Sequence, residues 1–232
     1  MTFQMYDRLE EICQELSDDN ELRVAIFRGA GDKAFVAGTE ISQFRDFRSA
    51  EDALRYEERL ERVFSKLEEV PVATIAMVHG VAAGGGAQLA LVCDLCYCSP
   101  GARFGVPIAR TLGNCLSGSG YARLVERLGP LRTRELLYTG RLIDAQEALT
   151  LGVVNQVIPE AELESRVIEV AAQVSSNAPL TIQVSKQAVL RQLRRNRLPL
   201  EPDLFLRCYE SEDFREAVKA FLDKRKPHWK GR

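Results

Sequence analysis

The central segment of the chain reads His79-Gly80-Val81-Ala82-Ala83-Gly84-Gly85-Gly86-Ala87-Gln88-Leu89-Ala90-Leu91. An apolar run, Val72 to Val78, precedes it and has the length of a buried strand. Helix formers follow the three glycines, which predicts the order strand, tight glycine turn, helix. The first N–H groups of a helix are unpaired and carry partial positive charge. The segment is therefore suited either to holding a developing negative charge or simply to close packing of the helix on the strand.

Several better-known motifs are excluded. The glycines lack the G-x-G-x-x-G spacing of a dinucleotide site, and no Gly-Lys-Ser/Thr of a P-loop follows them. Gly118-Ser119-Gly120 lacks the spacing of a hydrolase nucleophile elbow. The two histidines, His79 at a strand end and His228 in a basic tail, are better explained as core and surface residues than as catalysts.

The composition indicates an ordinary water-soluble enzyme-sized protein. Its 232 residues are 46% hydrophobic and 28% charged, which fits one large domain, with or without a small appendage. The formal net charge of −2 gives no reason to expect a nucleic acid or a membrane surface as partner. Residues 1–7 have neither a basic segment nor an apolar one that would suggest a secretory signal, so a cytoplasmic location is expected.

Three of the six cysteines, Cys93, Cys96 and Cys98, are close enough in sequence to raise the question of a metal. A zinc site needs a second pair of cysteine or histidine ligands at a matching distance, and the chain offers none. We therefore expect no metal, and buried free thiols in a core strand.

The pattern along the chain is α/β, and we divide it into a core at 1–158 and a helical region at 159–232. Strands are predicted at 22–27, 72–78, 93–98 and 153–158, and a long helix runs from Ser49 to Leu67. Residues 104–120 carry many glycines and are predicted to be loop-rich. The basic run Arg191 to Arg195 is explained by a solvated helix end or by phosphate binding.

A second glycine break, at Gly38, lies in Lys33-Ala34-Phe35-Val36-Ala37-Gly38-Thr39-Glu40-Ile41. Two N–H groups from separate loops can together stabilise one oxyanion. Backbone electrostatics is therefore the chemical device that the residues support best.

These segments resemble a known family. The segment 33–41 resembles the A-F-x-A-G-x-D-[ILV] motif of the enoyl-CoA hydratase/isomerase (crotonase) superfamily, and 80–90 looks like its G-x-A-x-G-G-G-x-E-L-A motif. Further similarities follow in order over nearly the whole chain: Asp94, Phe104–Pro107, Tyr138–Gly140, Asp144–Ala148, Gly152–Val154 and Ala217–Arg225.

The resemblance implies an acyl-CoA thioester as substrate, with coenzyme A as part of it and no other cofactor. It implies that the backbone N–H groups of Thr39 and Gly85 hold the enolate. By position, the other substrate-binding residues are Ala37, Glu40 and Ile41 at the adenine end, with Phe221 and Lys224 reaching the CoA of a neighbouring subunit. The implied fold is a spiral of repeated β-β-α units followed by helices that mediate trimerisation, in a homotrimer or a dimer of trimers.

Two positions depart from the hydratases of this family, which use two glutamates to activate water. The first falls at Gln88 and the second at Ile108. An amide can orient water but cannot act as a general base, and isoleucine can do neither. Losing a positioned acid or base costs ~100- to 10,000-fold in rate. Arg110 is the notable polar neighbour; it could bind a carboxylate on the acyl group, lie free on the surface, or pair with Glu40.

The family usually begins with a strand pair and an N-R-P-x-x-x-N-A segment, whereas this sequence starts at Met1-Thr2-Phe3. We therefore expect the strand pair to be missing and an apolar edge to be poorly covered where it would lie.

The function expected on these grounds is that of an enoyl-CoA hydratase, a lyase of fatty acid metabolism. The alternatives are isomerisation, decarboxylation or thioester hydrolysis by the same enolate chemistry, or acyl-CoA binding with weak catalysis, because both glutamates are replaced.

Overall fold

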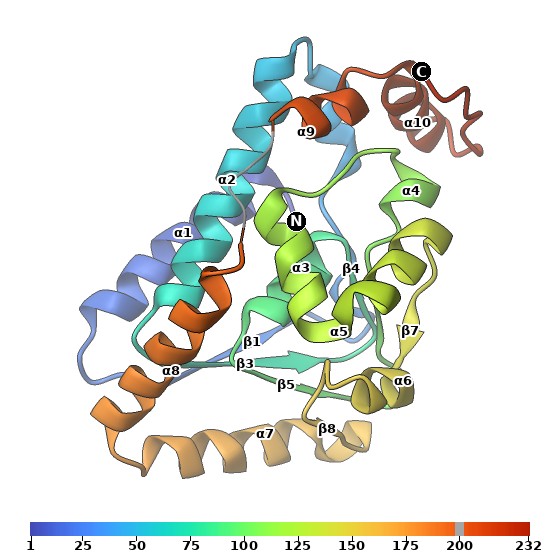
Figure 1. Cartoon of the computed structure of the whole chain (residues 1–232). Helices are drawn as coiled ribbons and strands as arrows, with labels where there is room; N and C mark the ends of the chain where they lie inside the picture. Colours follow the sequence, from blue (N-terminus) through green and yellow to red (C-terminus); the bar gives the residue numbers. More distant parts are fainter. Residues whose placement is uncertain (198–201) are drawn as a thin grey trace.

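The computed structural model describes residues 1–197 and 202–232. Two four-stranded sheets form its centre (Figure 1). The first is entirely parallel, in the order β1-β3-β5-β8, with β1 (Val24–Arg28), β3 (Ala73–Val78), β5 (Leu95–Cys98) and β8 (Gln156–Val157). The second has the order β2-β4-β6-β7, with β2 (Ala34–Val36), β4 (Val81–Ala83), β6 (Arg103–Gly105) and β7 (Ile143–Asp144).

Successive strands alternate between the two sheets, and this alternation makes the chain a spiral. β1, β3 and β5 enter the first sheet, and β2, β4 and β6 follow each of them into the second. A helix then leads to the next turn: α2 (Ala50–Glu69), α3 (Gly85–Val92) and, after the short α4 (Ile108–Thr111), α5 (Gly118–Thr139). These repeated β-β-α turns confirm the predicted fold.

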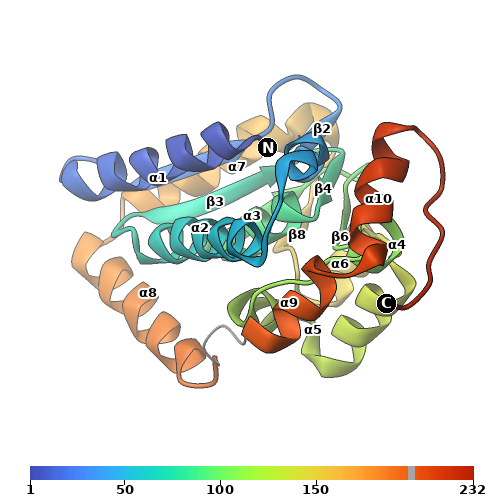
Figure 2. The same cartoon turned by 90° about the horizontal axis from the view of Figure 1, so that it is seen from above.

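Helices cover both faces of the first sheet. All six residues of β3 are buried, as expected for a strand that is covered on both sides. α1 (Phe3–Asp18), α2 and α3 lie on one side, and α7 (Glu160–Ser175) lies on the other (Figures 1 and 2). The α7 side has its own apolar cluster, in which Ile75 and Met77 pack with Leu163 and Val167.

The C-terminal helices lie against the spiral. α8 (Pro179–Arg194) is anchored by Lys186, whose Nζ donates to Asp94 Oδ2 at 2.8 Å and to the Val72 carbonyl at 2.9 Å. α9 (Pro202–Tyr209) and α10 (Glu212–Leu222) follow, and Phe214 of α10 packs edge-on against Phe44 at a ring distance of 6.0 Å. Phe44 belongs to the 3₁₀ helix η1 (Ile41–Asp46).

Two sequence expectations are refined by the structure, and a third stays open to test. The predicted strand at 93–98 begins only at Leu95, because α3 runs on to Val92. The segment predicted to be loop-rich contains β6 and α4, because short elements leave little periodicity in a glycine-rich sequence. β1 is an outer strand of the first sheet, and Ile26 on it is 38% exposed; the missing strand pair stays a prediction.

No helix in the described part of the chain is both long and apolar enough to cross a membrane.

Candidate active site

Two glycine turns meet at one edge of the second sheet. β2 and β4 are parallel neighbours, so the turns that leave them lie side by side. Gly38 follows β2 with φ 132°, and Gly84 joins β4 to α3 with φ 54°. Both values lie in the region that favours glycine. A Cβ placed on Gly84 would lie 3.8 Å from the Gly38 Cα. The sheet register therefore brings together the two residues that follow, Thr39 and Gly85.

The backbone N–H groups of Thr39 and Gly85, here called the amide pair, are free to act as donors. Within residues 1–197 and 202–232 neither N–H donates a hydrogen bond. Gly85 is the first residue of α3, so the helix dipole adds positive potential at its N–H. Thr39 Oγ1 lies 3.3 Å from the point that a Gly85 Cβ would occupy. Two free donors from separate turns can stabilise a developing oxyanion.

Two tyrosine hydroxyl groups fix the Thr39 side chain beside this pair. Tyr6 OH lies 2.7 Å from Thr39 Oγ1, and Tyr56 OH lies 2.9 Å from the same atom. Burial raises the pKa of Tyr6 to about 12, so this phenol stays neutral over the physiological range. The hydroxyl groups of Tyr6, Thr39 and Tyr56 hydrogen-bond to one another, and we interpret them as a structural support rather than as catalysts.

The two positions of the missing glutamates differ in their surroundings. Gln88 is buried on α3, and its Nε2 donates to the Gly120 carbonyl at 3.4 Å. Its Oε1 is buried and accepts no hydrogen bond from any described residue. Ile108 is half-buried and begins α4. Neither position supplies a carboxyl group.

The residues expected at the CoA lie on two segments that pack together. Ala37 is exposed, and Ile41 begins η1. The Glu40 carboxylate accepts from Ser42 N at 3.1 Å, and the hydrogen bonds from Ser42 hold the pKa of Glu40 below its ordinary value. On α10 and just beyond it, Phe221 is 50% exposed and Lys224 is exposed. α10 packs on η1 of the same chain, and the approach to a neighbouring subunit stays a prediction.

Arg110 lies on the exposed side of α4. Its Cβ lies 2.7 Å from the point that a Cβ on Gly140 would occupy, so its stem covers the end of α5. Among the described residues it forms no ion pair, with Glu40 or with any other carboxylate.

A second polar group was missed by sequence reasoning. Glu57 of α2 is only 3% exposed, and Tyr209 OH donates to its Oε1 at 2.8 Å. Asn114 Nδ2 in turn donates to Tyr209 OH at 3.1 Å. Burial raises the pKa of Glu57 to about 8. The available signal was its spacing: Glu57 falls four residues after Ala53 and seven before Phe64, on the apolar face of the helix.

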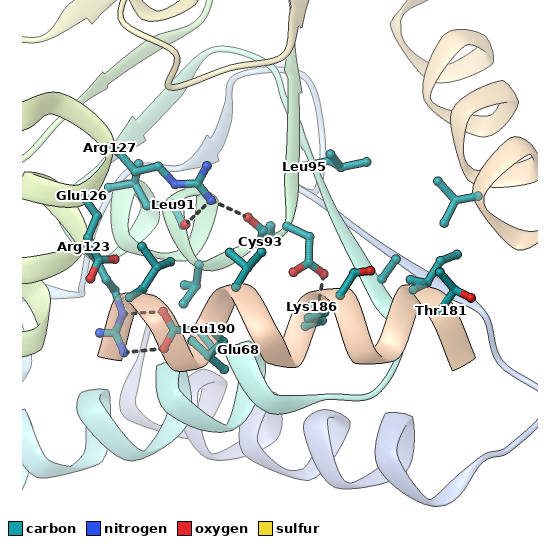
Figure 3. A pocket seen from close by; sticks show the side chains of 18 of the residues that line it. Glu68, Leu91, Cys93, Leu95, Arg123, Glu126, Arg127, Thr181, Lys186 and Leu190 are labelled. Atoms are coloured by element: carbon teal, nitrogen blue, oxygen red, sulfur yellow. Dashed lines mark hydrogen bonds and ion pairs between the residues drawn. The ribbon is translucent and has the colours of Figure 1, made fainter. Parts of the chain in front are cut away.

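Two cavities lie between the outer helices and the rest of the fold. One of about 500 Å³ lies between the η1–α2 junction and α9–α10, and Tyr209 forms part of its wall. The other, of about 620 Å³, lies under α8 (Figure 3) and contains ion pairs such as Arg123 with Glu68. None of the predicted site residues lines either cavity, so neither cavity is assigned to the site.

The cysteine cluster has no special environment. Cys93, Cys96 and Cys98 are buried free thiols. Across residues 1–197 and 202–232 no three histidine, cysteine or acidic side chains come together as metal ligands.

Comparison with known proteins places this chain in a family. The family model described as enoyl-CoA hydratase/isomerase matches residues 1–232. The short-chain-enoyl-CoA hydratase of Clostridium acetobutylicum is 35% identical over 221 residues, which cover 94% of this chain and 84% of that protein. The carnitinyl-CoA dehydratase of Proteus mirabilis is 36% identical, with 96% and 87% covered.

Solved structures give the same answer. A methylmalonyl-CoA decarboxylase in complex with 2-nitronate-propionyl-CoA superposes with a TM-score of 0.85 at 30% identity, covering 97% of this chain and 88% of that one. An enoyl-CoA hydratase/carnithine racemase from Magnetospirillum magneticum gives 0.81 at 30% identity, with 100% and 87% covered. The chain belongs to the enoyl-CoA hydratase/isomerase family and is an acyl-CoA enzyme of the hydratase/isomerase type.

Proposed function

We propose that this enzyme adds water across the Cα=Cβ bond of a 2-enoyl-CoA thioester. The observation that carries the proposal is the amide pair: two N–H groups without acceptors, on adjacent glycine turns, one of them at a helix N-terminus. As water attacks Cβ, the thioester oxygen gains negative charge, and the amide pair stabilises it more strongly than it stabilises the ground-state carbonyl.

Gln88 has the role of a positioning group in this proposal. Its Oε1 is a buried acceptor that receives no hydrogen bond from a described residue. Such atoms are rare unless a water or a ligand donates a hydrogen bond to them. A water molecule that donates to Oε1 would be oriented without being deprotonated, because an amide is not a base at neutral pH. Ile108 contributes only apolar contact.

The CoA part of the substrate is assigned to the segments around η1. We propose that Ala37, Glu40 and Ile41 border the adenine end and that Phe221 and Lys224 contact the CoA of a neighbouring subunit in a homotrimer or a dimer of trimers. The exposed Phe221 supports this, since half of its surface is left uncovered within one chain. Arg110 would bind a carboxylate on acyl groups that carry one.

Crotonyl-CoA turnover tests the activity directly. We expect the absorbance of the conjugated thioester to fall as 3-hydroxybutyryl-CoA forms, confirmed by mass spectrometry. Crotonyl-CoA and a panel of longer enoyl-CoA thioesters that all bind without gaining water would overturn the proposed function.

The amide pair can be tested by removing one N–H. Gly85 is the first residue of its helix, where proline is tolerated, but an added Cβ would lie 2.2 Å from Tyr6 OH. We therefore compare Tyr6→Phe/Gly85→Pro with Tyr6→Phe/Gly85→Ala, which differ in the N–H group. The proline variant should turn over ~100- to 1,000-fold more slowly than the alanine variant. Equal rates in two folded proteins would remove Gly85 from the oxyanion site.

A further inference from the structure

Glu57 is a buried carboxyl group without a counterion. In the described ranges, 1–197 and 202–232, it forms no ion pair; the Tyr209 hydroxyl donates to it, and the nearby Ser117 backbone lowers its pKa. Burying a carboxyl group without a cation is costly, and burial of that kind recurs at sites where a proton is transferred. We name Glu57, Asn114, Ser117 and Tyr209 the Glu57 cluster.

The Glu57 cluster is linked to both sides of the amide pair. On one side, Ser117 Oγ accepts from Gly120 N at 3.2 Å, and the Gly120 carbonyl accepts from Gln88 Nε2, one turn after Gly85. On the other side stands Tyr6, whose hydroxyl lies next to Gly85 and Thr39. Glu57 is close enough to Tyr6 for its charge to reinforce the effect of burial on the pKa of that phenol.

Two orphaned acceptors belong to the same network. Asn114 Oδ1 and Gln88 Oε1 are both buried, and neither accepts a hydrogen bond from a described residue. Their own amide nitrogens are bonded to Tyr209 and to Gly120, so both side chains are held in place. Two fixed acceptors that receive no hydrogen bond from a described residue point to a bound group that donates hydrogen bonds to them, such as water.

We propose that Glu57 is the acid–base catalyst of this enzyme, in place of the two glutamates that the sequence lacks. The inference rests on the proposed hydration and names its proton carrier. The Glu57 carboxylate takes a proton from water while the water oxygen bonds to Cβ. The π electrons move to the thioester, whose oxygen is held by the amide pair. The Glu57 carboxylic acid then returns the proton to Cα as the enolate collapses, so one water is added and no redox step is involved.

The surroundings of Glu57 set its working pH. Burial raises its pKa to about 8, while the Tyr209 hydrogen bond opposes that rise. Among the described residues, the titratable groups that interact with it are acids: Tyr6 of α1, Tyr56 and Glu61 of α2, Cys115, Tyr121 of α5 and Tyr209 of α9. Because the base form accumulates only through pH 8, the hydration rate should rise with pH and reach half its maximum near pH 8.

The test is Glu57→Gln, which keeps the shape and an acceptor for Tyr209 but cannot carry a proton. Crotonyl-CoA hydration should fall ~100- to 10,000-fold, while the Kd for the unreactive butyryl-CoA changes less than about threefold. The matched control is Glu58→Gln, the exposed next residue of the same helix, which should keep the wild-type rate. Glu57→Asp, which retains a carboxyl group, should recover part of the activity and its rise with pH.

The outcomes separate the two proposals. Wild-type protein that hydrates no enoyl-CoA overturns the proposed function and the inference with it. Active wild type together with an equally active Glu57→Gln overturns the inference alone. If Glu57→Gln does not fold, the wild-type profile decides: a rate that does not rise between pH 7 and 9 contradicts a base with this environment.

Discussion

The amide pair and the Glu57 cluster are built differently. The amide pair is positioned by backbone: adjacent parallel strands, two glycine turns and a helix start, all within residues 34–86. The Glu57 cluster is positioned by side chains from α2, α9 and the segment before α5, and Tyr209 is 152 residues from Glu57 in sequence. A site positioned by the backbone tolerates few substitutions but leaves a clear pattern in the sequence. A site built from side chains of distant elements tolerates more substitutions and leaves almost no pattern in the sequence.

The largest effect should come from disturbing the backbone that positions the amide pair. A Cβ on Gly86 would lie 1.9 Å from the Val36 carbonyl oxygen, a backbone atom of β2 that cannot move alone. Gly86→Ala should lower the free energy of unfolding by at least about 3 kcal/mol. Thermal unfolding measures this, with Gly101→Ala as control, because a Cβ there meets nothing within 4 Å. Equal melting temperatures for the two variants would show that α3 does not need its close approach to β2.

The next largest effect should be on the pH dependence of the unfolding free energy, through Glu57 of the Glu57 cluster. The pKa of Glu57 is about 8 in the folded protein, against an ordinary value of 4.5. The folded state therefore holds this proton more tightly than the unfolded state does, and the resulting stability is lost as the pH rises from about 4.5 through 8. The Glu57→Gln side chain stays neutral at every pH. The unfolding free energy of this variant, relative to that of the wild type, should therefore increase by a few kcal/mol from pH 5 to pH 8.

Urea denaturation at several pH values measures that difference. Glu58→Gln, which changes the exposed neighbour, should follow the wild-type curve throughout. Parallel curves for Glu57→Gln and wild type would mean that Glu57 is solvated in the folded protein.

A smaller change is expected from Tyr209→Phe, which removes the hydroxyl that donates to Glu57 at 2.8 Å. That hydrogen bond lowers the pKa of Glu57, so its loss should move the midpoint of the rate profile above pH 8. The rate at pH 7 should fall roughly three- to tenfold, because a typical hydrogen bond contributes about 0.5–1.5 kcal/mol. Tyr138→Phe, on a tyrosine that is 77% exposed, should leave the profile in place. A lower rate with an unmoved midpoint would separate Tyr209 from the titration of Glu57.

The same contrast explains what the sequence could and could not predict. The run before His79 and the three glycines led to β3 and the start of α3, because hydrophobic periodicity and glycine are local signals. The substitutions at Gln88 and Ile108 were likewise readable, since each stands inside a short motif.

Glu57 was not identified as a site residue, although it stands in the middle of an apolar helix face. An acidic residue at that spacing indicates burial, but burial alone does not name a partner. The partner, Tyr209, comes from α9, which follows the whole spiral in sequence and packs back on α2. Contacts of that range depend on the assembled fold and have no periodic signature in the chain.

The smallest effect should come from Arg110, which lies outside both regions on an exposed side of α4. Arg110→Gln should change the KM for crotonyl-CoA by less than about twofold, as for most exposed substitutions. With glutaconyl-CoA, whose acyl group ends in a carboxylate, the KM should rise roughly threefold, because an exposed ion pair contributes about 0.2–1 kcal/mol. Arg134→Gln, on an exposed arginine of α5, controls for the change in net charge. The same KM ratio for both substrates would mean that Arg110 does not contact the acyl group.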